Sequence, residues 1–166
     1  MNFKSDIMLR KKFDGFDENG NLPYGMYYMT LKEIKEIFSN TKRRKEIIKE
    51  YEKHLEEIKN TGYFIDHWID GSFITSKENP NDIDTLTEFN GYEAEKNNKK
   101  REIEDLIMTS KSKTKGYCHS FRVYRYPHYE KTDYEYFLKS KIRILTKLFG
   151  QDRKGNKKGV IHLIGD

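Results

Sequence analysis

The sequence predicts a single α+β domain in which helices flank a small mixed β-sheet. A charged segment at residues 42–59 repeats its apolar side chains at helical spacing, and Thr41 before it is a suitable N-cap. Three later segments, at residues 63–69, 82–89 and 117–126, are rich in β-branched and aromatic residues and are typical of strands. With 166 residues, the chain has room for one hydrophobic core.

Shorter elements complete the predicted domain. Thr30 and Glu33 match a capping box, which indicates a helix that begins at residue 31. The other segments follow in chain order: an irregular N-terminal arm (1–25), that first helix (31–38), a charged helix (93–108), a flexible basic loop (111–115), a helix that opens at Thr132 or Asp133 and ends at Gly150, a polar loop (151–158) and a last strand (159–164). This mixed order of helices and strands favours the α+β class.

The composition excludes several classes of protein. Cys118 is the only cysteine, so the chain forms no internal disulfide and no CxxC metal site. No apolar run approaches the ~20 residues of a membrane span, and the N-terminus lacks the apolar segment of a secretory signal. We therefore expect a cytoplasmic protein that does not enter membranes. The net charge of +5 is gathered in basic clusters at residues 42–45, 99–101, 111–115 and 154–158, which we interpret as solvated helix ends and loops.

The segment that carries most chemical information is Gly71-Ser72, followed after a polar loop by Asp82-Ile83-Asp84. Two carboxylates at positions i and i+2 of a strand project from the same face, where their mutual repulsion favours a cation between them. Mg²⁺ suits this place, because it is commonly held by one or two carboxylates together with substrate phosphates. A Gly-Ser turn lets a phosphate approach the backbone and offers amide and hydroxyl donors. The pattern therefore predicts a site for Mg²⁺ and a nucleotide triphosphate.

This pattern resembles the signature of the nucleotidyltransferase superfamily. Three stretches together are similar to an uncharacterised bacterial and phage family of nucleotidyltransferase-like proteins: FDENGNLPYG in the arm, GSFITSKENPNDID at residues 71–84, and DRKGNKKGVIHL at residues 152–163. The resemblance implies a minimal nucleotidyltransferase-like fold and Mg²⁺-dependent transfer of NMP from an NTP to a protein or RNA hydroxyl. It places Asp82 and Asp84 as catalytic metal ligands, and Gly71 and Ser72 against the nucleotide.

The chain departs from the superfamily pattern at one point. Active members usually carry a third carboxylate on a later strand, and the matching segment at residues 117–126 contains neither Asp nor Glu. His119 could act there as the catalytic base, and Arg122 or Arg125 could contact the nucleotide phosphates. The alternative is that His119 is a packed strand residue and that the arginines are surface charges. Asp66, Asp70 and Glu88 are near the motif in sequence, but none is where the third ligand is expected.

The missing carboxylate keeps two other functions open. One is a catalytically inactive protein of the same fold that binds a partner protein, such as an antitoxin, a defence component or a phage-encoded inhibitor of a host nucleoprotein. The other is a nucleotide sensor that binds without turnover.

Overall fold

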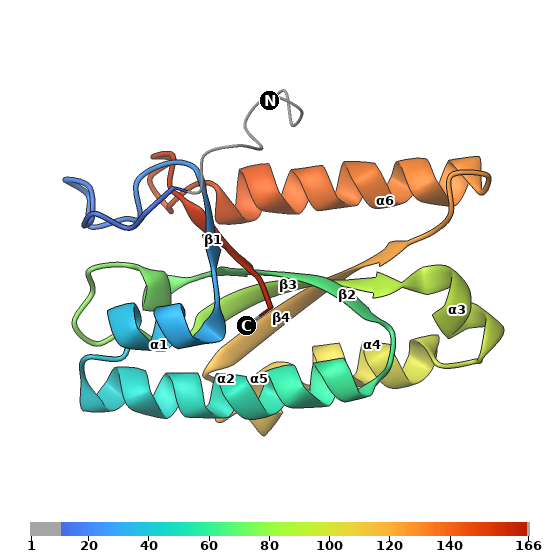
Figure 1. Cartoon of the computed structure of the whole chain (residues 1–166), viewed down its shortest axis with the longest axis horizontal. Helices are drawn as coiled ribbons and strands as arrows, with labels where there is room; N and C mark the ends of the chain where they lie inside the picture. The colour runs from blue at the N-terminus through green and yellow to red at the C-terminus, as the bar shows by residue number, and fades with distance from the viewer. Residues whose placement is uncertain (1–10, 166) are drawn as a thin grey trace.

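The computed structural model describes residues 11–165, which form a five-stranded mixed sheet with helices on both faces (Figure 1). The strands have the order β1-β5-β2-β3-β4. β1 pairs with β5, and β3 with β4, in parallel, whereas β2 is antiparallel to both β5 and β3. Their bounds are β1 Met26–Met29, β2 Phe64–Asp70, β3 Ile83–Asn90, β4 Cys118–Arg125 and β5 Val160–Leu163. The prediction of an α+β domain is confirmed.

The helices divide unequally between the two faces of the sheet. α1, α2, α4 and α5 lie on one side and α6 lies on the other, as Figure 1 shows. The helix bounds are α1 Leu31–Phe38, α2 Lys42–Asn60, α3 Gly91–Lys96, α4 Lys100–Met108, α5 Ser110–Lys113 and α6 Lys131–Arg143, after which Ile144–Phe149 continue as a π-helical segment. Among residues 11–165 no helix is both long enough and apolar enough to cross a membrane.

Strand alternation builds a separate core on each face. We call the side under α6 the α6 face, and on it Trp68, Leu86 and Val123 pack against Phe137 of the helix. On the opposite side, the α2 face, residues such as Ile69 pack in a larger cluster with α1 and α2. Neighbouring residues of one strand therefore belong to different cores.

Local sequence signals explain where the first helices begin. The Thr30 hydroxyl accepts a hydrogen bond from the Glu33 amide, and the Glu33 carboxylate accepts one from the Thr30 amide. Thr41 caps α2 in the same way, by accepting from the Arg44 amide. Both helices have the predicted starts.

The structure differs from the predicted elements in three places. The helix expected over residues 93–108 is broken into α3 and α4, since Asn98 has a φ of 54°, outside the helical range. The expected loop at residues 111–115 begins instead as the short helix α5. No strand was predicted at Met26–Met29, although β1 forms there beside β5.

The described part of the N-terminal arm docks on the domain; its residues 1–10 lie outside the described range. The Phe13 ring packs against Phe16 and Phe38, with centroids 5.1 and 5.5 Å away. Leu22 is almost completely buried, at 1% exposure. The irregular segment therefore belongs to the α2-face core, although it forms no helix or strand.

Candidate functional site

Gly71 brings the two halves of the predicted motif together. Its φ of 89° is in the region that favours glycine, and a Cβ there would lie 2.7 Å from the Asp84 amide nitrogen. The Phe73 amide also donates to the Asp82 carbonyl, at 3.1 Å. The turn after β2 and the start of β3 are thus in direct backbone contact, which only glycine permits at this position.

The Ser72 side chain ties the loop that follows to the start of β3. Its hydroxyl accepts from the Asn81 amide at 2.8 Å and from the Asp82 amide at 3.3 Å. It also lies 3.2 Å from Asp82 Oδ1. Ser72 therefore shapes the motif from within, which is a structural contribution that the sequence pattern does not reveal.

Two arginines of α2 hold the same loop from outside. The Arg44 guanidinium is buried and donates to the carbonyls of Phe73 and Thr75, at 2.6 and 2.7 Å. Arg43 donates to the Pro80 carbonyl and stacks on the Tyr117 ring. The interpretation of the 42–45 cluster as a solvated helix end is therefore wrong for these two residues, because loop carbonyls supply the partners that water would otherwise provide.

Register places three ionisable residues in one row across the α6 face. Asp84 pairs with Asp70 of β2 on one side and with His119 of β4 on the other. His119 Nδ1 lies 3.6 Å from Asp84 Oδ1, and both side chains reach solvent, at 48% and 28% exposure. Burial raises the pKa of Asp84, and the adjacent Asp82 raises it further. The structure thus brings Gly71, Asp82, Asp84 and His119 to one place.

Asp70 is a member of this row that sequence reasoning did not select. It is buried, and Lys158 Nζ lies 2.7 Å from its Oδ1. Burial raises the pKa of Asp70 to about 7, although the ammonium of Lys158 opposes the shift. Asp70 could have been selected from its position immediately before Gly71. Its partner Lys158 could not, because nothing in the sequence links two residues that are so far apart.

Two five-residue turns with the same pattern, Asp-x-x-Gly-Asn, secure the segment before Lys158. In the turns 17–21 and 152–156 alike, the backbone amide of the aspartate donates to the backbone carbonyl of the asparagine. The aspartate carboxylate in turn accepts from the backbone amide of the asparagine. The turns are joined by Asn21 Nδ2, which donates to Asp152 Oδ2 at 3.1 Å. They connect two of the stretches on which the family resemblance rests.

Arg122 does not join the cluster. It lies on the α2 face, since it is three residues from His119 along β4, and its Nη2 is 2.5 Å from Glu104 of α4. Its predicted contact with nucleotide phosphates at this site is therefore not supported by its position. Arg125 is on the α6 face but near the far end of β4, where it pairs with Glu88.

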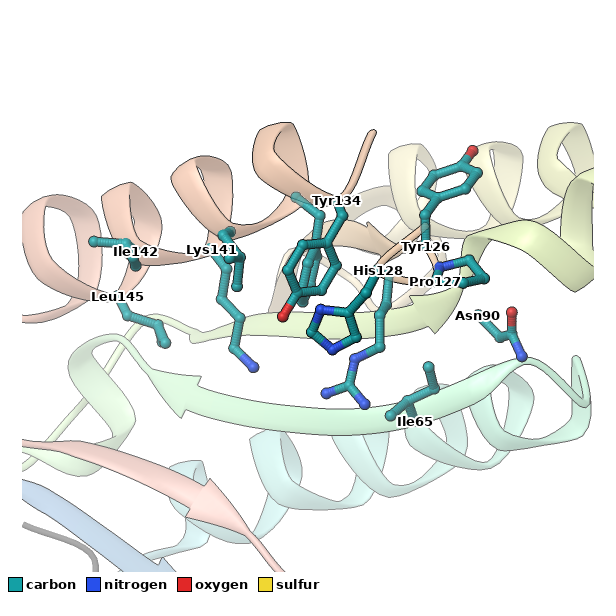
Figure 2. A pocket seen from close by; sticks show the side chains of 12 residues that line it. Ile65, Asn90, Tyr126, Pro127, His128, Tyr134, Lys141, Ile142 and Leu145 are labelled. Atoms are coloured by element: carbon teal, nitrogen blue, oxygen red, sulfur yellow. The ribbon is translucent and has the colours of Figure 1, made fainter. Parts of the chain in front are cut away.

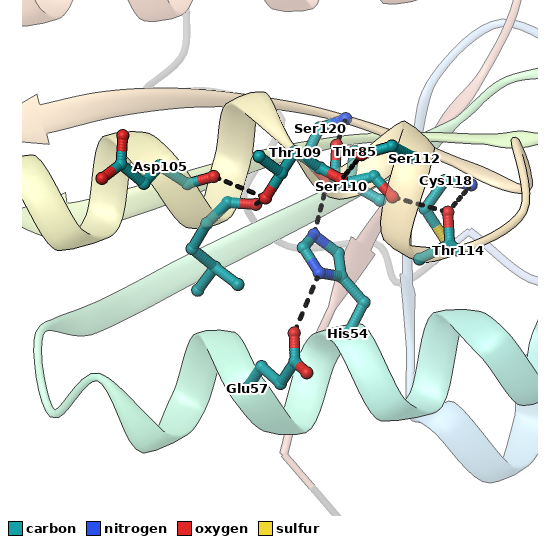
Figure 3. A network of polar contacts seen from close by, with 11 residues as sticks. His54, Glu57, Thr85, Asp105, Thr109, Ser110, Ser112, Thr114, Cys118 and Ser120 are labelled. Atoms are coloured by element: carbon teal, nitrogen blue, oxygen red, sulfur yellow. Dashed lines mark hydrogen bonds and ion pairs between the residues drawn. The ribbon is translucent and has the colours of Figure 1, made fainter.

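A polar network on the α2 face supports the strands that carry Asp84 and His119 (Figure 3). Their strand neighbours Thr85 and Ser120 are buried and share a hydrogen bond of 3.0 Å. Ser120 also lies 2.9 Å from Nε2 of His54, a residue of α2. Burial lowers the pKa of His54, so this histidine is a neutral partner near pH 7. The network fixes β3 and β4 to each other and to the helix.

The sequence profile of a family of unknown function, DUF6932, matches residues 15–164. The chain belongs to this family. No curated protein and no solved structure matches it. The DUF6932 match includes both Asp-x-x-Gly-Asn turns, the Gly71 turn and the row of ionisable residues, so all of these features lie within the family region.

The donor set of this DUF6932 chain suits a divalent cation that brings further ligands with it. Asp82 and Asp84 offer hard carboxylate oxygens. The pKa of Asp84 is raised first by burial and then by repulsion from Asp82, and a cation would relieve that repulsion. Within residues 11–165 no group of three or more His, Cys, Asp or Glu side chains is arranged to hold a metal ion. A metal at Asp82 and Asp84 would therefore share its coordination with phosphate oxygens and water.

Proposed function

We propose that this DUF6932 protein is a cytoplasmic, nucleotidyltransferase-like protein that binds an NTP with Mg²⁺ and transfers NMP to a protein or RNA hydroxyl. The observation that carries the proposal is the approach of Gly71 to Asp84. The pattern required a Gly-Ser turn beside an Asp-x-Asp strand, and a Cβ at Gly71 would lie 3.1 Å from Asp84 Oδ2. Elements that the sequence separates by a polar loop are thus in contact.

Each residue of the cluster then has a defined role. Asp82 and Asp84 would hold Mg²⁺, which when bound neutralises charge on the triphosphate. The missing side chain of Gly71 lets the start of β3 lie against the turn, and Ser72 holds the loop between them in place, so that the turn and the two carboxylates would face the triphosphate together. Lys158 holds Asp70 beside Asp84, so that the carboxylates keep their spacing.

His119 is the candidate base for the acceptor hydroxyl. It lies beside Asp84 and is half exposed, so an acceptor can reach its ring from solvent. This assignment gives His119 a role at the position where the resemblance implies a third carboxylate.

A specific observation also favours a second function, the binding of a partner protein without turnover. The residue beside Asp84 on β4 is His119 and not an acid, and Asp70 is neutralised by Lys158. The two-carboxylate cluster would then bind a nucleotide or a basic partner segment and leave it unchanged. An antitoxin, a defence component or an inhibitor of a nucleoprotein would act in this way.

A thermal-shift and transfer experiment tests these functions together. Mg²⁺ with ATP should stabilise the wild type, by about 2.7 kcal/mol at about 100 times the dissociation constant. Asp82→Asn and Asp84→Asn should lose most of this effect, whereas Asp105→Asn on α4 is a matched control on another surface and should keep it. Transfer of labelled AMP to an acceptor, lost in both site variants and in His119→Ala, would support the enzyme.

The other outcomes separate the alternatives. A shift without transfer supports a sensor or binding protein. If neither Mg²⁺ nor any of the four NTPs shifts the wild type, the nucleotide proposal is wrong. The binding of a partner protein would then remain as the proposed function of the cluster.

A further inference from the structure

A pocket lies on the α6 face, at the end of β2, β3 and β4 away from the Asp82–Asp84 cluster. It is an open pocket of about 750 Å³ between α6 and the sheet (Figure 2). From Asp84 to Glu88, which lies beneath this pocket, β3 advances four residues, or roughly 13 Å. The pocket is thus on the same face as the cluster but is a separate place.

The wall of this pocket is basic. Arg125 and Lys141 line it, and none of the described residues that line it is acidic. Glu88 is completely buried and forms ion pairs with both cations, at 2.7 Å to Lys141 Nζ. A guanidinium and an ammonium together carry more N–H donors than one carboxylate can accept. Glu88 therefore orients the two cations and leaves donors for a ligand.

The rest of the wall is apolar and aromatic. The rings of His128 and Tyr134 lie together, with centroids 4.1 Å apart, and Figure 2 shows both beside the Lys141 side chain, which extends from α6 toward the sheet. Ile142 and Leu145 extend the apolar surface along the helix. A flat ring would find stacking partners here, within reach of the cations.

We propose that this pocket binds a small organic anion that carries one phosphate or carboxylate and a planar ring. Arg125 and Lys141 hold the anionic group, and the rings of His128 and Tyr134 contact the planar part. The volume is within the usual range for small-molecule sites. This site is independent of the proposed nucleotide transfer, since it uses no residue of the Asp82–Asp84 cluster.

Trp68 provides a direct readout. It is the only tryptophan of the chain, and Lys141 Nζ lies 4.2 Å from the centre of its ring. A ligand that engages Lys141 should therefore change the Trp68 fluorescence. We expect a saturable change with AMP if the anion is a phosphate and with 4-hydroxyphenylacetate if it is a carboxylate. Ribose 5-phosphate, which has no planar ring, and adenosine, which has no charge, should bind at least about tenfold more weakly than AMP.

Matched variants assign the signal to the pocket. Lys141→Gln keeps a hydrogen-bonding group for Glu88 but removes the charge, and should weaken binding roughly tenfold or more. Lys139→Gln removes a charge from an exposed position of the same helix and should have no effect. Lys141→Arg, which keeps the charge, should retain binding and guards against a general failure of Lys141→Gln to fold. Isothermal titration calorimetry measures the affinities of these variants independently of fluorescence.

Three results would overturn the proposal: no binding of either probe, equal binding to Lys141→Gln, or equal affinity for ribose 5-phosphate. Asp84→Asn separates this site from the proposed nucleotide site. AMP binding that disappears in Asp84→Asn belongs to the carboxylate cluster and contradicts the pocket assignment. AMP binding that survives there supports the pocket even if the protein transfers no nucleotide.

Discussion

At one end of the α6 face Asp84 lies beside Asp82 and is partly open to solvent, whereas at the other end Glu88 is fully buried and contacts Arg125 and Lys141. Both acids project from the same side of β3, four residues apart. At the open end negative charge is in excess and can attract a cation. At the covered end the acid is used to hold two cations, and the surface above it is basic.

The difference shows that burial and partners decide what a carboxylate contributes. Asp84 gains little from its surroundings as an ion, since burial and Asp82 both raise its pKa. Glu88 has two cationic partners within reach and would leave them unpaired if it were removed. We therefore expect Asp84 to contribute more to ligand binding than to the stability of the fold, and Glu88 to contribute mainly to stability.

The largest expected effect is from Glu88→Gln. Glutamine leaves Arg125 and Lys141, which are 45% and 20% exposed, without their buried acid, and the loss should reach about 3 kcal/mol at most because water screens the remaining charges. Asp84→Asn should leave stability unchanged or raise it, since it removes a charge that its neighbours disfavour. Urea denaturation at pH 7 measures both variants. Equal losses for the two would contradict the proposed division of roles.

Acidic pH should weaken the whole sheet and so limits the range in which the two ends can be compared. His67 is completely buried, and burial lowers its pKa from 6.5 to about 3. Since the unfolded chain takes up this proton first, stability is complete above about pH 6.5 and is lost as the pH falls toward 3. We expect a loss of roughly 2 to 3 kcal/mol between pH 7 and pH 4.5.

Denaturation curves across this range measure the effect of His67. His67→Gln can still hydrogen-bond Thr87, the partner of His67 Nδ1 at 2.9 Å. The dependence on pH should be flatter in this variant. An unchanged slope would assign the loss to other groups.

A smaller effect distinguishes two glycines that share a conformation. Gly71 and Gly62 both have positive φ, at 89° and 78°, but of the two only Gly71 has neighbours within 4 Å of the place that an added Cβ would take, the nearest being the Asp84 amide. Substitution by alanine should strain both backbones, by about 1–2 kcal/mol. Gly71→Ala should cost about 1 kcal/mol more, from the added overlap. It should also weaken the stabilisation by Mg²⁺ with ATP, which Gly62→Ala should preserve.

Much of the fold could be predicted because its signals are local. Thr30, Thr41 and the apolar spacing of α2 fix helix starts within a few residues, and alternation identifies β3 and β4. β1 could not be predicted in this way, since its four residues are a strand only because β5 lies beside them. The break at Asn98 likewise depends on an unusual φ that an asparagine can adopt but does not require.

The site was predictable from one local motif and, for His119, from the strand that the resemblance matches to the position of the third carboxylate. Gly71, Asp82 and Asp84 share one motif, and the structure brings them together. Lys158 enters from the other end of the chain, and Arg44 is buried by carbonyls of a loop that lies 29 to 31 residues further along the chain. Arg122 was wrongly placed beside the nucleotide because alternate residues of β4 point to opposite faces of the sheet, and Arg122 and His119 are three positions apart.

The place of β5 between β1 and β2 sets an order of assembly. β2, β3 and β4 can pair as soon as they leave the ribosome, whereas β1 has no neighbour until synthesis has passed residue 163. At typical rates of elongation this interval is on the order of ten seconds. The Asn21–Asp152 contact closes a loop of 131 positions, so it forms among the last. Lys158 therefore reaches Asp70 only after the rest of the cluster has been synthesised, and Asp70 lacks its ammonium partner until then.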